Sequence, residues 1–230
     1  MIKKYWLVGF ILLFPIAGYL LLSTGKNHFR SLPYFGPKSL SGKFKLVRGK
    51  SIPDTNYYKV PNFSLINQDN QLVKFNTLDS NLIWVINFFY SRGNNIDPII
   101  QKSMDSLVRQ FRIHEDVRFL SISLDPVFDS PLVLNKYAKS IGADTRRWSF
   151  LTGKGTETRQ IARNSFFVNT SYNSADSVTA HSPMLILLDP MHRIRGYYDG
   201  TREEDQKKLR DEIIVLRYEV MRKVTDLIQH

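Results

Sequence analysis

The side chains best suited to chemistry in this sequence are one imidazole and a few carboxylates. His181 opens an apolar segment, Asp97 stands directly before Pro98, and Asp125 and Asp129 lie close together in the chain. An imidazole and a carboxylate suit Zn(II) or Cu(II), although a stable site normally has three or four ligands. Paired carboxylates can share general acid–base work, but Asp125 and Asp129 also fit the end of a strand and the lead into a helix cap. We favour these structural roles for them.

The chain contains no cysteine. A thiolate is the nucleophile of disulfide exchange and of thiol peroxidases, and it is the soft ligand that Cu(I) selects. The sequence also lacks a phosphate-binding loop, a dinucleotide glycine fingerprint, a His-Glu-x-x-His motif and a nucleophile elbow. We therefore expect a protein that is not an enzyme, and we expect no resident cofactor.

The element that positions Asp97 is a strand–loop–helix unit with the sequence LIWVINFFYSRGNNIDP. The apolar run from Ile83 to Tyr90 predicts a central strand that is buried on both faces. A polar loop follows, and a helix is predicted over 98–113. Asp97 at the N-cap with Pro98 in the first turn would cap free backbone N–H groups, and we favour this role over metal ligation.

The rest of the folded part alternates between strand and helix patterns, which predicts an α/β domain. A capping box of Thr201 and Glu204 is expected to begin the last helix. This helix is longer than a domain of this size can cover, so the part beyond Tyr218 is expected to extend past the domain. That extension suits a partner helix or a membrane surface, or it is a solvated tail. The other predicted strands are 63–67, 72–75, 117–124, 184–188 and 193–198, and the other helices are a helix from 131, 156–164 and 202–229.

The N-terminal part has a different character. Residues 5–23 are apolar and free of charge, long enough for a membrane span, so 1–24 is predicted to be a transmembrane anchor. A basic linker or partly ordered lead-in follows over 25–56, and the compact domain covers 57–230.

The net charge is +11, and residues 1–50 carry nine Lys or Arg and no Asp or Glu. That leaves +2 for the remainder, so we expect contact with anionic lipid and not with nucleic acid. Charge alone leaves the membrane orientation open.

Three separated motifs together resemble one family. VPNFSLINQDNQLVKF, LDPVFDSP and HSPMLILLDPMHRIRGYY, in this order behind an apolar N-terminus, are similar to the SCO/SenC group. The resemblance covers about residues 57–215. It implies a thioredoxin-like fold, a central mixed sheet flanked by helices, on a single-pass membrane tether with the domain on the periplasmic or another extracytoplasmic side.

The resemblance also implies a site. Family members typically bind copper through a Cys-x-x-x-Cys-Pro loop at a helix start and a distant histidine. With Pro98 aligned on the family's proline, the cysteine positions fall on Gly93 and Asp97, and the histidine falls on His181. Two of the three implied ligands are therefore replaced.

Two functions are compatible with this pattern. The favoured one is a non-enzymatic assembly or interaction factor in cytochrome c oxidase maturation, whose partner is an oxidase subunit or a cysteine-bearing paralogue. The alternative is a residual carrier of copper or another metal that uses His181 with Asp97 or a ligand from a partner. The sequence does not identify the partner or the oligomeric state.

Overall fold

The computed structural model describes residues 31–228 except 48, 79–80, 94 and 171–180, together with Phe14. The predicted anchor over 1–24 therefore lies, apart from Phe14, outside the described residues. None of the helices in the described part combines the length and the apolar character that a membrane span requires.

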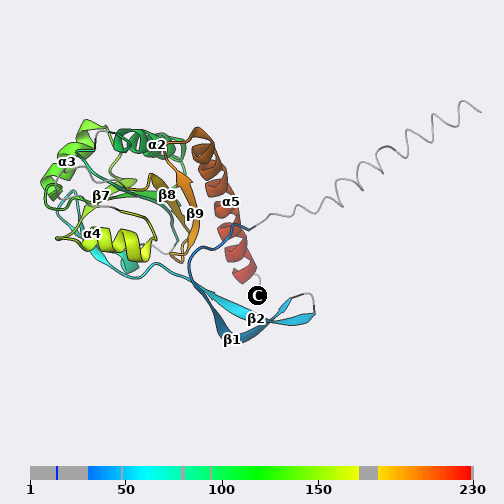
Figure 1. Cartoon of the computed structure of the whole chain (residues 1–230). Coiled ribbons are helices and arrows are strands. Elements are labelled where there is room, and N and C mark those ends of the chain that lie inside the picture. Colours follow the sequence, from blue (N-terminus) through cyan, green and yellow to red (C-terminus); the bar gives the residue numbers. More distant parts are fainter. Residues whose placement is uncertain are drawn as a thin grey trace, which may run out of the picture. The chain divides into compact units, whose positions relative to one another are not determined.

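The strands form two separate sheets (Figure 1). A seven-stranded sheet has the order β4-β3-β7-β6-β5-β8-β9, and β1 and β2 form a hairpin of their own. Both sheets are built from the following strands: β1 (Lys38–Val47), β2 (Lys50–Tyr57), β3 (Ser64–Asn67), β4 (Leu72–Lys74), β5 (Ile83–Phe89), β6 (Val117–Ser123), β7 (Trp148–Thr152), β8 (Met184–Leu188) and β9 (Ile194–Asp199).

The large sheet is mixed. β6 runs parallel to β5 and β7, whereas β8 pairs antiparallel with β5 and β9, and β3 pairs antiparallel with β7 and β4. The helices are α2 (Asp97–Gln110), α3 (Pro131–Ser140), α4 (Glu157–Gln160), which continues into a π-helical turn over Ile161–Ser165, and α5 (Glu203–Ile228). A short 3₁₀ turn, Phe75–Thr77, follows β4.

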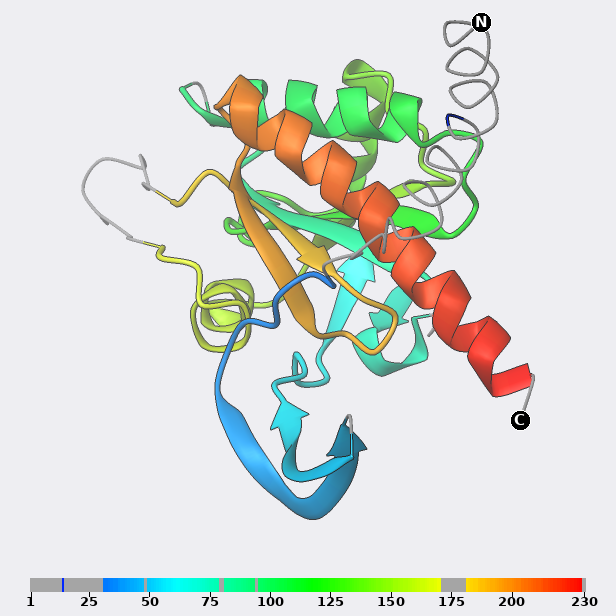
Figure 2. The ribbon, with the colours of Figure 1, turned by 90° about the vertical axis from the view of Figure 1, so that its right-hand side faces the viewer.

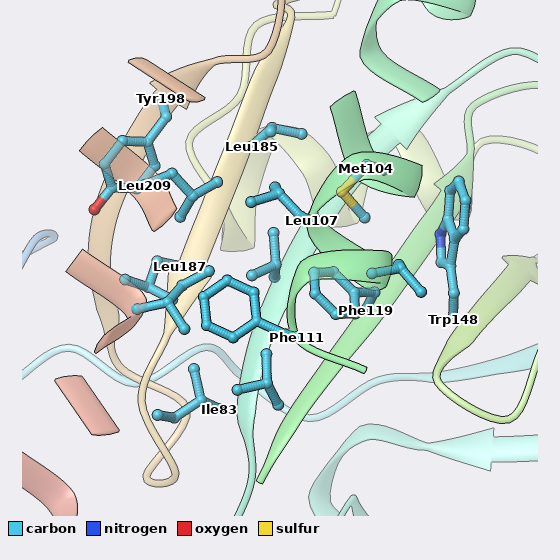
Figure 3. Packing of buried hydrophobic residues seen from close by; sticks show 14 of the residues in the cluster. Ile83, Met104, Leu107, Phe111, Phe119, Trp148, Leu185, Leu187, Tyr198 and Leu209 are labelled. Atoms are coloured by element: carbon cyan, nitrogen blue, oxygen red, sulfur yellow. The ribbon is translucent and has the colours of Figure 1, made fainter. Parts of the chain in front are cut away.

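The central strand β5 divides the core into two layers because its side chains alternate between the faces of the sheet. Ile83, Val85 and Phe89 pack in one cluster with α2, α3 and α5, part of which Figure 3 shows. Trp84 and Ile86 pack on the opposite face in a second cluster, with the turn after α4 and the residues around β3. All seven residues of β5 are buried, as the sequence predicted for a sheet covered on both faces.

The last helix has a buried half and an exposed half. Leu209, Ile213 and Leu216 are fully buried against the sheet, and each such side chain stabilises the fold by about 1.5–3 kcal/mol. Farther along α5, Tyr218 and Met221 are 57% and 46% exposed. Figure 2 shows α5 running across the face of the sheet and on past it.

The linker or lead-in predicted over 25–56 contains most of the β1–β2 hairpin. Two local predictions differ from the structure: β7 was not predicted, and the expected capping box does not form. Thr201 donates its hydroxyl hydrogen to Asp199 Oδ1 at 2.6 Å, and α5 starts only at Glu203. The carboxylate of Asp205, not of Glu204, accepts a hydrogen bond from the Asp199 backbone at 2.9 Å.

Candidate functional site

The candidate site lies where β5 ends and α2 begins, the place that the sequence indicated. The loop between them turns tightly, because the Gly93 N–H donates to the Tyr90 carbonyl at 3.0 Å. His181 reaches the site from a distant part of the chain, after the segment 171–180. Its backbone forms an antiparallel bridge with Thr170.

Asp97 and His181 form a buried pair. His181 Nε2 lies 3.0 Å from Asp97 Oδ1, and their side chains are only 1% and 7% exposed. The same Asp97 oxygen accepts a hydrogen bond from the Tyr90 backbone at 2.8 Å. The pair therefore ties the first residue after β5, the start of α2 and the segment before β8 to one carboxylate.

Both ring nitrogens of His181 have a hydrogen-bond partner. His181 Nδ1 lies 3.1 Å from the Ser182 carbonyl oxygen, which can only accept, so Nδ1 carries a hydrogen. The contact between Nε2 and Asp97 needs one further proton, held on either partner. Neither ring nitrogen has a lone pair directed to a free position, and a metal ligand needs such a lone pair.

The N-cap prediction for Asp97 is wrong. α2 begins at Asp97 itself, Ile96 is the cap residue, and no side chain makes a capping hydrogen bond there. The carboxylate turns to Tyr90 and His181 instead. Pro98 does occupy the first turn, as the sequence predicted.

Gly93 and Asp97 are matched to each other. A Cβ atom added at Gly93 would lie 2.8 Å from Asp97 Cβ and would overlap with the carboxylate. Such an approach is closer than real Cβ contacts allow, so the carboxylate of Asp97 occupies the space that a side chain at 93 would need. The side chains at the two implied cysteine positions would therefore occupy the same space.

A second carboxylate, Asp129, fixes the other side of the loop. The Asp129 side chain accepts hydrogen bonds from the hydroxyls of Ser91 and Ser123 and, at 3.3 Å, from the Ser91 backbone. Asp129 is completely buried. Burial raises its pKa, the hydrogen bonds from Ser123 and Ser91 lower it, and the nearby Asp125 carboxylate raises it again, so that the pKa lies above its ordinary value.

Asp125 has a separate role on the surface. It forms an ion pair with Arg92 at 2.6 Å, and the guanidinium lies over the Phe128 ring, 3.8 Å from its centroid. The two aspartates that could have been paired acids therefore hold two successive residues of the same loop. This arrangement supports the structural roles that the sequence favoured for Asp125 and Asp129.

Sequence reasoning did not find the seryl contacts of Asp129. Ser91 and Ser123 follow or end adjacent parallel strands, β5 and β6, and so lie at one edge of the sheet. A serine at the same end of each strand was the available signal, but serine is common at strand ends and does not by itself indicate a shared partner.

A pocket of about 360 Å³ lies beside the loop, lined by Ser91, Gly93, Pro98 and Tyr137 among others. Burial raises the pKa of Tyr137, and the carboxylates of Asp97 and Asp129 raise it further, so its phenol is neutral at physiological pH. The neutral ring of Tyr137 and residues of the loop therefore line the same pocket.

The donor set does not fit the copper site that the resemblance implies. Cu(I) prefers thiolates, and positions 93 and 97 offer a hydrogen atom and a carboxylate. The remaining imidazole, His181, is hydrogen-bonded through both ring nitrogens. Over the described residues, no three His, Cys, Asp or Glu side chains gather in a way that could hold a metal ion.

Comparisons with known proteins point in one direction. The family model described as SCO1/SenC matches residues 53–214. The chain is 28% identical over 154 residues to the SCO1 protein homolog of Bacillus subtilis (strain 168), which covers 66% of this chain and 79% of that protein.

Solved structures share the fold. A SCO1/SenC family lipoprotein from Bacillus anthracis matches with a TM-score of 0.63 and 22% identity, covering 69% of this chain and 95% of that one. BsSco matches with a TM-score of 0.60 and 27% identity over 69% and 93% of the two chains. Copper-bound ScoI of Arabidopsis thaliana matches with a TM-score of 0.58 and 21% identity over 68% and 98%. The predicted thioredoxin-like mixed sheet flanked by helices is confirmed.

Proposed function

The chain belongs to the SCO1/SenC family, and from this premise we propose that it is a membrane-anchored assembly factor in the maturation of respiratory cytochrome c oxidase. BsSco is described as a member of the Sco family of cytochrome c oxidase assembly proteins, and other relatives have been crystallised with copper bound. In our proposal this chain acts by contact with a partner on the periplasmic side and not through cysteine-based copper or redox chemistry.

The observation that carries the proposal is the buried pair of Asp97 and His181. The pair uses the imidazole that the resemblance assigns to copper, and it places a carboxylate where a thiolate would stand. It also links the loop, α2 and the segment before β8 through hydrogen bonds that need no ion. A bound copper ion would cross-link the same three segments. The hydrogen-bonded pair can therefore hold these segments together without the metal.

A contact role also agrees with the surface around the pair. Ile99 in the first turn of α2 is 47% exposed, and Val127 and Leu132, in and after the segment that holds Asp129, are 86% and 66% exposed. Exposed apolar side chains near a rigid loop suit a protein interface. The proposed partner is an oxidase subunit or a cysteine-bearing paralogue that carries the metal itself.

The proposal is tested first by metal titration of the full chain in detergent. Cu(I), in the presence of a chromophoric competitor, Cu(II) and Zn(II) are each added to the wild type, to His181→Ala and to the double variant Gly93→Cys/Asp97→Cys. We expect the wild type and His181→Ala to bind each metal equally weakly. The double variant removes the Asp97 carboxylate, frees His181 Nε2 and provides two thiolates, so its Cu(I) affinity should rise by orders of magnitude once the loop shifts enough to separate the Cβ atoms at 93 and 97.

Tight binding by the wild type that is lost in His181→Ala would instead establish the residual metal carrier.

A second measurement addresses the assembly of the oxidase itself. Removing the chain from its host should lower the amount of assembled cytochrome c oxidase, and added copper should not restore it. Restoration by copper alone would show that the chain serves metal delivery.

A further inference from the structure

The β1–β2 hairpin carries a row of exposed apolar side chains on one face. Leu40, Phe44 and Leu46 are 73%, 70% and 78% exposed. Their cross-strand partners show that they share this face, because Leu40 pairs with Thr55, Phe44 with Pro53 and Leu46 with Ser51. A hairpin in water would normally turn such a row toward a core.

Nothing in the described part of the chain covers this face. The hairpin pairs with no strand of the seven-stranded sheet, and in Figures 1 and 2 it stands apart from that sheet and its helices. Pro53 in β2 lacks a backbone N–H, which suits a strand that no third strand joins. The apolar row is therefore a surface to which something else must bind.

The charge of the hairpin indicates what that is. Residues 38–57 contain five Lys or Arg and a single acidic residue, a formal charge of +4. Lys43 and Lys50 are exposed, and none of the described carboxylates lies within ion-pair distance of them. Apolar side chains that are flanked by unpaired cations are the chemistry of an anionic membrane surface, where the chains enter the acyl boundary and the ammonium groups meet phosphate.

We propose that the β1–β2 hairpin docks onto an anionic lipid surface, with Leu40, Phe44 and Leu46 inserted below the headgroups. This inference rests on the membrane anchor of the proposed function. Strand β1 begins only 14 residues after the predicted anchor over 1–24, and 14 residues span at most about 50 Å, less here because Leu32 and Pro33 are bound to Arg195. The tether would therefore hold the hairpin close to the bilayer and make its binding an intramolecular step.

The test uses the absence of cysteine, because any introduced cysteine is unique in the chain. Leu46→Cys in the full chain is labelled with a fluorophore sensitive to polarity and reconstituted into vesicles of phosphatidylcholine alone or with phosphatidylglycerol. Ile113→Cys, at a similarly exposed apolar residue after α2 (74% exposed), is the matched control. We expect a blue shift at 46, and quenching by brominated acyl chains, in the anionic vesicles only. The label at 113 should emit as in water in both vesicles.

The variant Lys43→Glu/Lys50→Glu tests the charge. Each basic residue near an anionic leaflet contributes about fivefold to binding, so this variant should need several times more phosphatidylglycerol for the same quenching at 46. Flotation of the wild type with phosphatidylcholine vesicles reports the anchor separately. Water-like emission at 46 in anionic vesicles overturns the hairpin proposal, whether or not the chain floats. A blue shift equal in both vesicle types, unchanged by the charge reversal, overturns the anionic specificity.

Discussion

Two buried aspartates fix the loop between β5 and α2 through different hydrogen-bond partners. Asp97 is hydrogen-bonded to His181, whereas Asp129 accepts hydrogen bonds from two hydroxyls and a backbone N–H, and none of the described cations forms an ion pair with it. An unpaired buried carboxylate is costly when ionised, since burial favours its neutral form. The pKa of Asp129 is raised because burial disfavours its ionised form.

That cost predicts a pH dependence of stability. Because the pKa of Asp129 is raised in the folded state, the folded protein holds this proton at a pH where the unfolded chain has lost it. The free energy of unfolding should therefore decrease as pH rises from about 4, the ordinary aspartate value, through the raised pKa. Asp129→Asn keeps the shape of the side chain and cannot ionise, so it should lack this contribution.

The measurement is urea unfolding of the wild type and Asp129→Asn between about pH 4 and 7. The free energy of unfolding of the wild type minus that of the variant should fall across this window. Asp144→Asn is a control whose difference should stay nearly constant over this window, because the hydrogen bond from Arg146 lowers the Asp144 pKa and this carboxyl group titrates below about pH 4. A difference that stays constant with pH for Asp129→Asn would contradict the prediction.

The sequence located the site but not its hydrogen bonds. His181 and Asp97 were named as a possible pair, and they are in contact across 84 positions of the chain. The cap assigned to Asp97 failed because cap preferences describe only neighbouring residues, and the carboxylate has a stronger partner that the fold brings from elsewhere. The hydroxyls around Asp129 were beyond prediction for the same reason.

At the scale of elements, long apolar patterns were predictable and pairings were not. β5, β6, β8 and β9 follow clear apolar runs, and their expected ranges agree with the structure to within about two residues. β7 is short, and it is a strand because β6 and β3 pair with it on either side. Such strands are determined by their neighbours in space, which local pattern does not reveal.

Arg195 in β9 joins three elements at once. Its guanidinium donates to the carbonyls of Leu32 and Pro33, to Asp189 after β8 at 3.2 Å, and to Glu219 in the exposed half of α5 at 2.7 Å. Its side chain is 1% exposed. The extension of α5 is therefore fixed to the sheet through a buried charge, although its apolar face is partly in solvent.

Replacing this charge should destabilise the fold strongly. Arg195→Met keeps much of the length but removes the buried cation that Glu219 and Asp189 share and leaves Asp189, among the described cations, with Arg193 only, which costs about 3–5 kcal/mol of unfolding free energy. Amide hydrogen exchange should also accelerate around Glu219 and Leu32. The matched control is Arg202→Met, whose exposed pair with Glu204 should contribute less than about 1 kcal/mol. Equal losses for both variants would contradict this role of Arg195.

At the scale of the whole molecule, two sheets with separate hydrogen-bond ladders share one chain. The core lies on the seven-stranded sheet, its helices and the segments next to them, and none of the described side chains of β1 and β2 belongs to either buried cluster. The stability of the domain should then be nearly independent of the hairpin. Membrane docking and folding would be properties of different parts of the chain.

Excision of the hairpin tests this independence. Replacing residues 40–55 with a short Gly/Ser linker should lower the thermal midpoint by no more than about 2–4 °C, which corresponds to about 1 kcal/mol for a domain of this size. Leu65→Ala in β3, at a fully buried position, should lower it clearly more and shows that the assay senses the core. An equally large loss on excision would mean that the hairpin supports the domain.

The close approach of Gly93 and Asp97 also constrains how such a site can evolve. With aspartate at 97, a Cβ atom at 93 would overlap with the carboxylate, so a substitution at 93 alone requires the aspartate or the loop to move. The residue that position 93 tolerates therefore depends on the residue at 97. Among homologues the two positions should vary together, with glycine at 93 wherever 97 is aspartate.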